Sequence, residues 1–546
     1  MKKQSLFLLP VLVFTTLTSC AQLLNHKQDF TRQDTLRGSI TPERAWWDVV
    51  SYHIGVTPDY ASKTIEGKNE IRFKVLNAGS RMQIDLQEPM KIERAYWKNG
   101  NLPLERNGNV YFITFPETLQ EGVLETITLV YNGKPREALN APWDGGWIWK
   151  KDAKGRPWMS VACQGLGASV WYPCKDHQSD EPDSAQLSIA VPDTLVAVGN
   201  GKLLRKESHS AGMTTYTWGV SNPINNYNLI PYIGKYVNFS ETYSGEKGRL
   251  NNSYWVLDYN LDKAKKQFVQ AGHTLKALEH WFGPFPWYED DFKLVESPHL
   301  GMEHQSAVAY GNKYQNGYLG KDLSGSGWGM KWDFIIVHEV GHEWFGNNIT
   351  SKDIADMWEH EGFTSYSETL FTEYHFGKEA ANAYVQGIRK NISNDGPIIG
   401  HYGVNEEGSG DMYYKGSNML HTIRQIINDD EKFRSILRGL NKTFYHQTVT
   451  TQQVEDYIST QSGKDLSKVF DQYLRHTEIP LLKLDADGGV LKFKWEDCVE
   501  GFNMPVKLTN GLWLKPSTKW QEVKMDRKTA AQITADSNFY IRVKKG

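Results

Sequence analysis

The chain has 546 residues and a mass of 62.4 kDa, well above the usual size of one domain, so it has room for several domains with substantial cores. Its 61 Lys and Arg residues nearly balance 64 Asp and Glu residues, and the net charge of -3 provides no basic field for nucleic acid. Apolar residues make up 40% of the chain and charged residues 23%, a balance that excludes a disordered or fibrous protein.

The N-terminus is typical of an exported protein. Two lysines precede an apolar run over residues 6–17, which is too short to span a membrane, and the following Leu17-Thr18-Ser19-Cys20 resembles a bacterial lipobox. This pattern predicts a lipoprotein signal peptide over residues 1–19, acyl chains on Cys20 and a polar tether over residues 20–41. We therefore expect a lipoprotein of the periplasm or cell envelope that is anchored to the membrane through Cys20. An ordinary signal peptide with a chance cysteine is the alternative.

Three further cysteines follow, at positions 163, 174 and 498. Their odd number excludes a full disulfide framework. Cys163 and Cys174 could pair in an oxidising periplasm, or they could remain two buried free thiols.

Two kinds of periodicity divide the rest of the chain. Apolar and polar residues alternate over residues 42–238, between Asn-Gly and Glu-Gly turns, which predicts an antiparallel N-terminal β domain. Residues 239–478 are predicted to form a mainly helical domain, with apolar residues at helical spacing from 264 to 282 until Gly283 ends the helix. Alternation returns over residues 479–546 and predicts a small C-terminal β-sandwich. The expected fold class is multidomain α+β.

One segment of the helical region has the pattern of a metal site. His338-Glu339-Val340-Gly341-His342 places two histidines four residues apart on one face of a helix, where both imidazoles can bind one zinc ion. Glu339 follows the first histidine and can take a proton from water at the metal. A surface helix with two solvated histidines is the alternative interpretation.

A catalytic zinc ion needs a third protein ligand and an open position for water. Glu361 stands eighteen residues beyond His342 and is the candidate that we favour. Spacing alone leaves four other candidate ligands open: Glu359, His360, His299 and His304.

The helix that carries Glu361 is expected to begin at Asp356 and to end at Gly377. Glu361, Ser365 and Glu368 then share the face toward the first helix. Glu368 is therefore predicted to accept the free N–H of a zinc-bound histidine, as carboxylates behind metal ligands do.

These segments resemble the gluzincin aminopeptidases of the aminopeptidase N type. The two histidines and Glu361-Gly362-Phe363 have the spacing of that family. Three further stretches are similar to motifs of that family. Leu300-Gly301-Met302-Glu303-His304 resembles Gly-x-Met-Glu-Asn, and Tyr413-Tyr414-Lys415-Gly416 resembles Tyr-x-Lys-Gly. Cys163-Gln164 with Pro173-Cys174-Lys175-Asp176 resembles the stretch whose glutamine contacts the amino end of the substrate. The resemblance covers the chain from about residue 45 to the C-terminus, and its thermolysin-like catalytic domain would correspond to residues 239–478.

The resemblance implies one zinc ion per chain with His338, His342 and Glu361 as ligands. It implies Glu339 as the general base, and Tyr413 as the phenol that faces the developing oxyanion.

The resemblance also implies that Glu303 and Gln164 anchor the free α-amino group of a peptide, with Gly301 and Met302 in the same substrate-binding loop. A buried carboxylate that awaits an ammonium group disfavours a blocked or mid-chain nitrogen. The expected activity is therefore zinc-dependent removal of N-terminal residues from peptides, and we expect a monomer.

Two positions depart from the family pattern, since His304 replaces its Asn and Leu300 its first Gly. Tyr414 also stands beside Tyr413 and is an alternative for the oxyanion-facing phenol. Larger family members carry a helical C-terminal domain over the cleft. Because the sequence contains no such domain, we expect an enzyme of three domains with an open cleft that residues 479–546 do not cover.

Two other functions compete with an aminopeptidase. A thermolysin-type endopeptidase shares the helix motif, but the motif around Glu303 favours an exopeptidase. A non-catalytic lipoprotein that binds peptides or glycans would explain the 12% aromatic content, but binding alone needs neither Glu339 nor Tyr413. The family's epoxide-hydrolysing branch has no separate support in the sequence.

Overall fold

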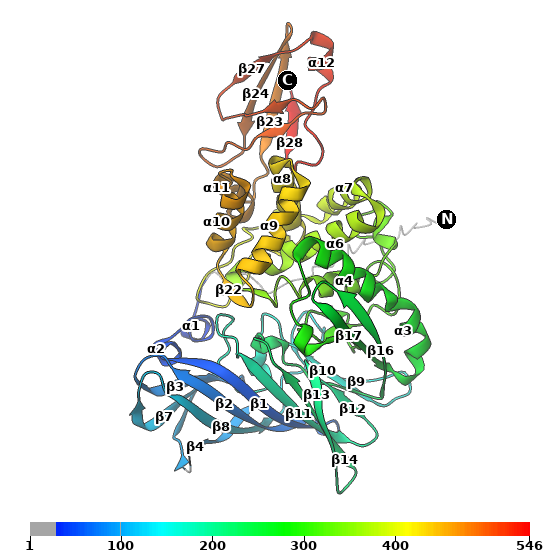
Figure 1. The fold of residues 1–546 in the computed structure, drawn as a ribbon. Helices are drawn as coiled ribbons and strands as arrows, with labels where there is room; N and C mark the ends of the chain where they lie inside the picture. Colours follow the sequence, from blue (N-terminus) through cyan, green and yellow to red (C-terminus); the bar gives the residue numbers. More distant parts are fainter. Residues whose placement is uncertain (1–28, 99) are drawn as a thin grey trace, which may run out of the picture.

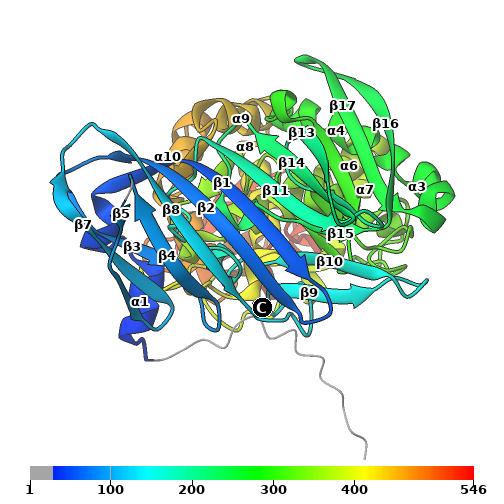
Figure 2. The ribbon, with the colours of Figure 1, turned by 90° about the horizontal axis from the view of Figure 1, so that it is seen from below.

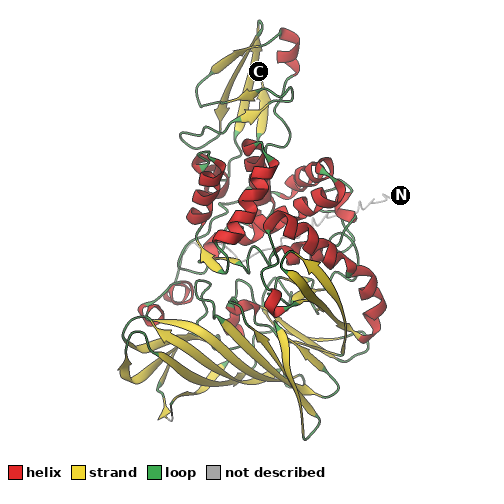
Figure 3. Ribbon diagram, viewed as in Figure 1, coloured by secondary structure: helices red, strands yellow, loops and turns green. Residues whose placement is uncertain are grey.

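The computed structural model describes residues 29–98 and 100–546, which form three stacked regions. A β-rich region lies at one end, a mainly helical region in the middle and a small β domain at the other end (Figure 1). Figure 3 shows that strands dominate both ends and helices the middle. The predicted multidomain α+β class is confirmed.

The N-terminal region is built on an eight-stranded sheet, which Figure 2 shows from below. Its strands, in spatial order, are β13 (Lys202–His209), β14 (Met213–Val220), β11 (Ser184–Pro192), β1 (Trp47–Asp59), β2 (Thr64–Val75), β8 (Leu124–Gly133), β4 (Lys91–Trp97) and β5 (Gly100–Asn101). Neighbouring strands run antiparallel, except that β1 pairs in parallel with β11. The period-two pattern has its expected cause, since Ile65, Ile71 and Phe73 of β2 are buried while Glu66, Lys68 and Arg72 are exposed.

Two smaller sheets complete this region. One contains β3 (Gly79–Asp85), β7 (Val110–Leu119) and β6 (Leu104–Asn107), and the other contains β12 (Val196–Val198), β15 (Tyr232–Gly234), β10 (Pro157–Ala162) and β9 (Gly146–Lys151). Cys163 and Cys174 are both buried here as free thiols, so the alternative of a disulfide between them does not hold.

The middle region combines a five-stranded sheet with the helices that carry the candidate site. The sheet contains β16 (Tyr236–Gly245), β17 (Gly248–Leu257), β18 (Phe292–Glu296), β20 (Val308–Tyr310) and β19 (Gly301–Met302). The helices are α3 (Leu261–Gln267), α4 (Val269–Phe282), α5 (Phe334–Gly341), α6 (Trp358–Phe376), α7 (Lys378–Gly387), α8 (Tyr414–Ile427), α9 (Asp430–Thr443), α10 (Thr451–Ser462) and α11 (Ser467–Arg475). The helix expected over 264–282 is divided at Phe268, and Gly283 ends it at a φ of 96°.

The division placed between residues 238 and 239 falls inside β16. That strand pairs along its whole length with β17, and β17 pairs with β18 of the helical region. The period-two signal therefore continues into the middle region, because this region begins with a hairpin of its own.

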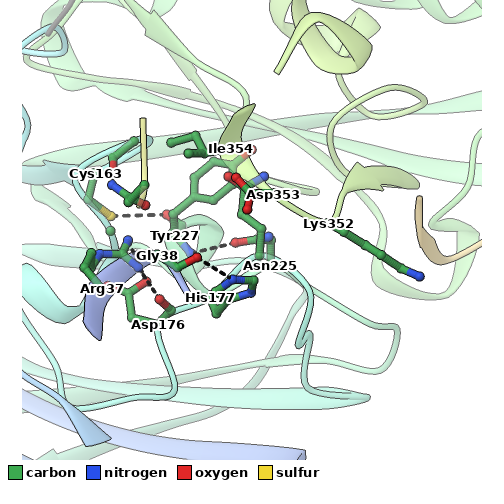
Figure 4. Close-up of a pocket in the computed structure, with 14 residues that line it drawn as sticks. Arg37, Gly38, Cys163, Asp176, His177, Asn225, Tyr227, Lys352, Asp353 and Ile354 are labelled. Atoms are coloured by element: carbon green, nitrogen blue, oxygen red, sulfur yellow. Dashed lines mark hydrogen bonds and ion pairs between the residues drawn. The ribbon is translucent and has the colours of Figure 1, made fainter. Parts of the chain in front are cut away.

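The N-terminal segment is in part folded, which differs from the tether expected over residues 20–41. Helix α1 (Arg32–Gly38) starts at a capping box formed by Thr31 and Asp34. Its end packs into the junction of the other regions, where Arg37 pairs with Asp176 (Figure 4). A β-carbon on Gly38 would lie 2.1 Å from the backbone nitrogen of Asn405, so helix and loop are in close contact. The predicted signal peptide and Cys20 lie outside the described residues.

The C-terminal domain is a four-stranded sheet with a two-stranded ribbon and one short helix. The sheet contains β27 (Gln521–Lys524), β24 (Val490–Glu496), β23 (Leu481–Asp487) and β28 (Arg542–Lys545), the ribbon β25 (Val506–Lys507) and β26 (Trp513–Leu514), and the helix is α12 (Arg527–Gln532). It docks through contacts such as the bond from Gln386 Nε2 to Asn538 Oδ1, at 2.8 Å. Within the described ranges, no helix has the length and apolar character needed to cross a membrane.

Candidate active site

Helix α5 is held by a buried network around its first residue. Asp333 caps the helix by accepting from the backbone N–H groups of Ile335 and Ile336. The same carboxylate accepts from Tyr310 Oη, Asn312 Nδ2 and Gln267 Nε2, each at 2.7 Å. These bonds fix the helix against the five-stranded sheet and the end of α3, so its histidines have defined positions.

The hydrogen bonds of His338 and His342 leave one nitrogen of each ring free for a metal. His338 Nδ1 lies 2.8 Å from Glu368 Oε1, and His342 Nδ1 lies 3.0 Å from the carbonyl oxygen of Phe345. Each Nδ1 therefore carries the proton, and each Nε2 is left with its lone pair. Tyr384 Oη in turn donates to Glu368 Oε2 at 2.6 Å, which orients that carboxylate.

Glu361 completes a set of three donors. Its Oε2 lies 3.6 Å from His338 Nε2 and 3.3 Å from His342 Nε2. Ligand atoms about 2.1 Å from a tetrahedral zinc ion are about 3.4 Å apart, so the spacing fits. Glu361 Oε2 is buried and has no hydrogen-bond partner among the described residues. A metal ion bound here would be the partner of this oxygen. Burial would raise the pKa of Glu361, but the adjacent histidines outweigh it and hold the pKa below its usual value.

The other ligand candidates point elsewhere. Glu359 is buried away from the two histidines, near Asp356 and Glu455, and its burial raises its pKa well above the ordinary value. His360 Nε2 accepts from the backbone N–H of Ser351 at 2.9 Å. Among the described residues, neither belongs to a group of three side chains that could hold a metal ion, and the same is true of His299 and His304.

The start of α6 differs from the expectation. The helix begins at Trp358, and Asp356 does not cap it. The Asp356 carboxylate instead accepts from Thr451 Oγ1 at 2.7 Å and from Tyr402 Oη at 2.6 Å. Gly377, with a φ of 90°, ends the helix as expected.

Glu339 lies beside the three donors without joining them. Its carboxylate groups with Glu303 and His342, with ligand atoms within 4.8 Å of one another. Burial is the largest effect on this carboxyl and raises its pKa to about 7, with Glu303 and Glu361 acting in the same direction. A β-carbon on Gly301 would lie 2.5 Å from Glu339 Oε1, so the loop can approach this carboxylate only with glycine at that position.

Glu303 and Gln164 lie on the substrate side of the donors. Glu303 is 2% exposed, and its Oε1 accepts from Tyr227 Oη at 3.0 Å. Gln164 Nε2 donates to Glu361 Oε1 at 3.2 Å, so in this structure the amide contacts a metal-ligand candidate. Asn347 Nδ2 supports the loop by donating to the backbone carbonyl of Glu303 at 2.8 Å.

The two departures from the family motif have local explanations. His304 is fully buried, and its Nδ1 lies 2.6 Å from Tyr232 Oη, whose proton goes to the carbonyl of Ala307. The imidazole therefore anchors the loop to β15. The backbone carbonyl of Leu300 accepts from Gly311, which holds the start of β19.

A cavity of about 230 Å³ opens beside the donors. Its lining comes from the β region and the helical region: Arg136, Asn140, Pro142, Trp143, Asp144, Gln164, Leu166, Met302, Met357, Glu361, Glu407, Met412 and Tyr413. All of these described lining residues precede position 479, in agreement with the expectation that the C-terminal domain does not cover the cleft.

Tyr413 is the better placed of the two adjacent tyrosines. It lines the cavity, and its ring centroid lies 6.1 Å from that of His338. Tyr414 instead begins α8 and is not part of the lining. Burial, with the carboxylates of Glu361 and Glu407, raises the pKa of the Tyr413 phenol well above its usual value, so the phenol keeps its proton.

Several residues at the site had no signal in the sequence. Tyr227, Tyr384, Asn347 and Glu407 belong to no motif, and chain folding alone brings them to the donors. Trp143 is another: it lies in the β8–β9 loop and is 52% exposed at the cavity. A buried tyrosine or a second acid in Glu406-Glu407 has no sequence feature that separates it from many others.

The fold and the donors define a metallohydrolase site: two histidines and one carboxylate, with a further buried carboxylate beside them. Residues 259–473 match the model of the peptidase family M1 domain. The helical region therefore contains a domain of the peptidase family M1 type, as found in the gluzincin aminopeptidases of the aminopeptidase N type, and this match and the donor set together indicate zinc as the metal.

Known proteins of similar sequence and structure support this assignment. Leukotriene A-4 hydrolase from Xenopus laevis is 22% identical over 57% of this chain and 51% of its own length. Aminopeptidase M1-B from Oryza sativa is 22% identical over 86% of this chain and 54% of its own length. The chain thus spans about half the length of these relatives.

The fold is also similar to that of a solved M1 zinc metallopeptidase from Deinococcus radiodurans. The TM-score is 0.69 at 21% identity, over 82% of this chain and 98% of that one. A variant of the same Deinococcus protein was solved with a Tyr-Ser-Ala substrate.

Proposed function

We propose that this protein is a zinc aminopeptidase that removes N-terminal residues from peptides. The observation that carries the proposal is the carboxylate of Glu303, which is buried within 4.8 Å of donor atoms of Glu339 and His342. A buried carboxylate without a cation is costly, and the ammonium group of a peptide N-terminus would relieve that cost. The aminopeptidase relative and the Deinococcus protein solved with a tripeptide are consistent with such a substrate.

His338, His342 and Glu361 would hold the metal. Zinc, when bound, supplies Lewis-acid chemistry that polarises the scissile carbonyl and makes water more acidic. Glu368 keeps His338 in the tautomer that ligates, and Tyr384 fixes Glu368 in turn.

Glu339 and Tyr413 would carry the proton transfer and the charge. Glu339 takes a proton from the attacking water and later passes it to the leaving amine, a role that its position beside the three donors allows. Tyr413 keeps its phenol proton and donates a hydrogen bond to the developing oxyanion, an interaction often worth about 3 kcal/mol.

Glu303 makes the reaction specific for the chain end. With an acetylated or mid-chain nitrogen, its carboxylate stays desolvated and unpaired, and the substrate loses tenfold in affinity for each ~1.4 kcal/mol of that cost. Gln164 is close enough to the same cavity to contact the amino group once a substrate displaces its bond to Glu361.

The test compares leucyl arylamide with its N-acetyl derivative, using protein loaded with zinc. We expect the protein to cleave only the substrate with the free amino group. Glu303→Ala should lose that preference. Equal rates on both substrates would favour an endopeptidase of the thermolysin type. If zinc-loaded protein cleaved no peptide and Glu339→Ala changed nothing, the binding-protein alternative would replace the proposal.

We further propose that the chain is exported and anchored through acylated Cys20. The support is the short apolar run followed by the lipobox-like residues. Expression in bacteria with labelled palmitate should label the wild-type chain and leave Cys20→Ala unlabelled and released from the membrane fraction. Equal labelling of both chains would refute the anchor.

A further inference from the structure

Glu407 is an unexpected carboxylate in the wall of the catalytic cavity. It lines the cavity together with Glu361 and Tyr413. Among the described residues, no hydrogen bond or ion pair engages its carboxylate. Burial, with the charges of Glu361 and Glu303, raises the pKa of Glu407 to about 7. These surroundings disfavour the ionised form of Glu407, and a cation beside the carboxylate would favour it.

The loop around Glu407 holds this carboxylate in place. Asn405 Nδ2 donates to the carbonyl of Gly165 at 3.0 Å, and the backbone N–H of Gly403 donates to Asp353 Oδ2 at 2.8 Å. Glu406 pairs with His401. A β-carbon on Gly165 would lie only 2.7 Å from Glu407 Oε1, so glycine at 165 leaves the space that the carboxylate occupies.

The walls near Glu407 suit the stem of a long side chain. Leu166, Met302, Met357 and Met412 line the same cavity, and methionine adapts to flexible guests. An apolar cavity of about 150 Å³ accommodates benzene, so about 230 Å³ has room for a lysine or arginine stem. Such side chains bury their methylene groups against apolar walls while their charged ends find a partner.

The charges of the cavity also favour a cation. Its lining contains the acids Asp144, Glu361 and Glu407 and a single base, Arg136, which is exposed and forms no ion pair with Glu407. Glu361 is assigned to the metal, and Asp144 Oδ2 accepts from the backbone of its own loop at 2.7 and 2.9 Å, which ties Asp144 to that loop while its Oδ1 has no partner among the described residues. Glu407 is the lining acid with neither a metal role nor a bond to the backbone.

The α-amino group has a different partner. Glu303 groups with Glu339 and His342 close to the metal donors, whereas Glu407 belongs to neither cluster of donor atoms. The site therefore offers two separate carboxylates: Glu303 beside the metal donors and Glu407 in the cavity lining.

We propose that Glu407 is a specificity-determining residue that pairs with the charged end of an arginine or lysine at the N-terminus of the peptide. The inference rests on the proposed aminopeptidase function and adds to it the class of the preferred first residue. The charge-assisted bond is strongest for a guanidinium group, which can present two donors to one carboxylate.

The test compares arginyl, citrullyl and leucyl arylamides, because citrulline has the shape of arginine without its charge. The wild-type protein should have a kcat/KM for arginyl about tenfold or more above that for citrullyl arylamide. In Glu407→Gln this ratio should fall to about one, because the arginyl value falls to that of citrullyl arylamide. Glu406→Gln, on the same loop but outside the cavity lining, should keep the wild-type ratio.

A binding measurement separates this inference from the proposed function. L-arginine should raise the melting temperature of the wild-type protein more than L-citrulline does, and Glu407→Gln should abolish the difference. Leucyl cleavage without arginine preference, or an equal loss on all three substrates in Glu407→Gln, would overturn the inference and leave the aminopeptidase intact. No cleavage of any arylamide would refute the aminopeptidase, and the arginine-binding result would still decide the role of Glu407.

Discussion

The two sides of the active site, named the metal wall and the recognition wall, are built in different ways. The metal wall comes from α5 and α6, and its donors lie within 24 residues of one another, between His338 and Glu361. The recognition wall draws on Gln164, Tyr227 and Glu407, which lie on separate segments of the β region and the helical region. Local helix geometry thus positions the metal donors, whereas the packing of distant segments positions the residues proposed to recognise the substrate.

This difference predicts a graded response to substitution. A change at the metal wall removes a group that acts on the reacting atoms, whereas a change at the recognition wall weakens contacts that several residues share. Effects should therefore decrease from Glu339, through the partners of the metal ligands, to the outer support of the loops.

The largest effect is expected for Glu339→Gln. The variant keeps the shape of the side chain but cannot accept a proton, so kcat should fall about 10³-fold or more. Zinc content, measured by elemental analysis, should stay at the wild-type level because Glu339 is not among the three donors. Near-normal turnover with full zinc would remove Glu339 from its proposed role.

The next largest effect concerns the metal affinity. Glu368→Gln weakens the bond to His338 Nδ1, and the zinc affinity should fall about 10–100-fold, as measured by competition with a chelator. Glu359→Gln is the matched control, because this residue lies buried on the same helix without contacting a ligand candidate. Equal affinities in the two variants would contradict the arrangement.

A smaller effect is expected for Tyr227→Phe. The substitution removes the hydroxyl that donates to Glu303, so KM for leucyl arylamide should rise about fivefold with a lesser change in kcat. Tyr236→Phe removes a buried hydroxyl that bonds the backbone of Glu296 and should leave KM unchanged. A rise in KM for both variants would indicate a general loosening of the structure around the site.

The smallest effect is expected outside both walls, at α1. Deleting residues 1–40 removes the pairing of Arg37 with Asp176 and the support of Gly38 for the 404–405 backbone. The melting temperature should drop by about 3 °C or more relative to a chain that lacks residues 1–28 only. If the two shortened chains had the same melting temperature, α1 would contribute nothing to the stability of this junction.

Much of the metal wall was predictable from the sequence. The four-residue spacing of His338 and His342 and the shared face of Glu361 and Glu368 follow from 3.6 residues per turn. The start of α6 was not predictable, because Asp356 bonds Thr451, which is 95 residues away in the chain. In the sequence, an aspartate that bonds a distant residue cannot be distinguished from one that caps the helix after it.

The division of the chain shows the same limit. Period-two alternation correctly located the N-terminal sheets, but it did not reveal that β16 belongs to the next region, because a strand has the same pattern whichever sheet it joins. The polar composition of residues 20–41 indicated a tether, yet α1 folds there since Leu36 and Gly38 find buried contacts.

By itself the sequence determined the α+β class, the histidine pair on one helix face and Glu339 beside it, because helix periodicity and short motifs act over a few residues. Spacing left Glu361 as one of several candidates for the third ligand. Only the tertiary structure decided which histidine nitrogens are free, that Gln164 contacts Glu361, and that Glu407 enters the cavity. Those features depend on contacts between residues far apart in the chain, and such contacts arise when the β region and the helical region pack against each other.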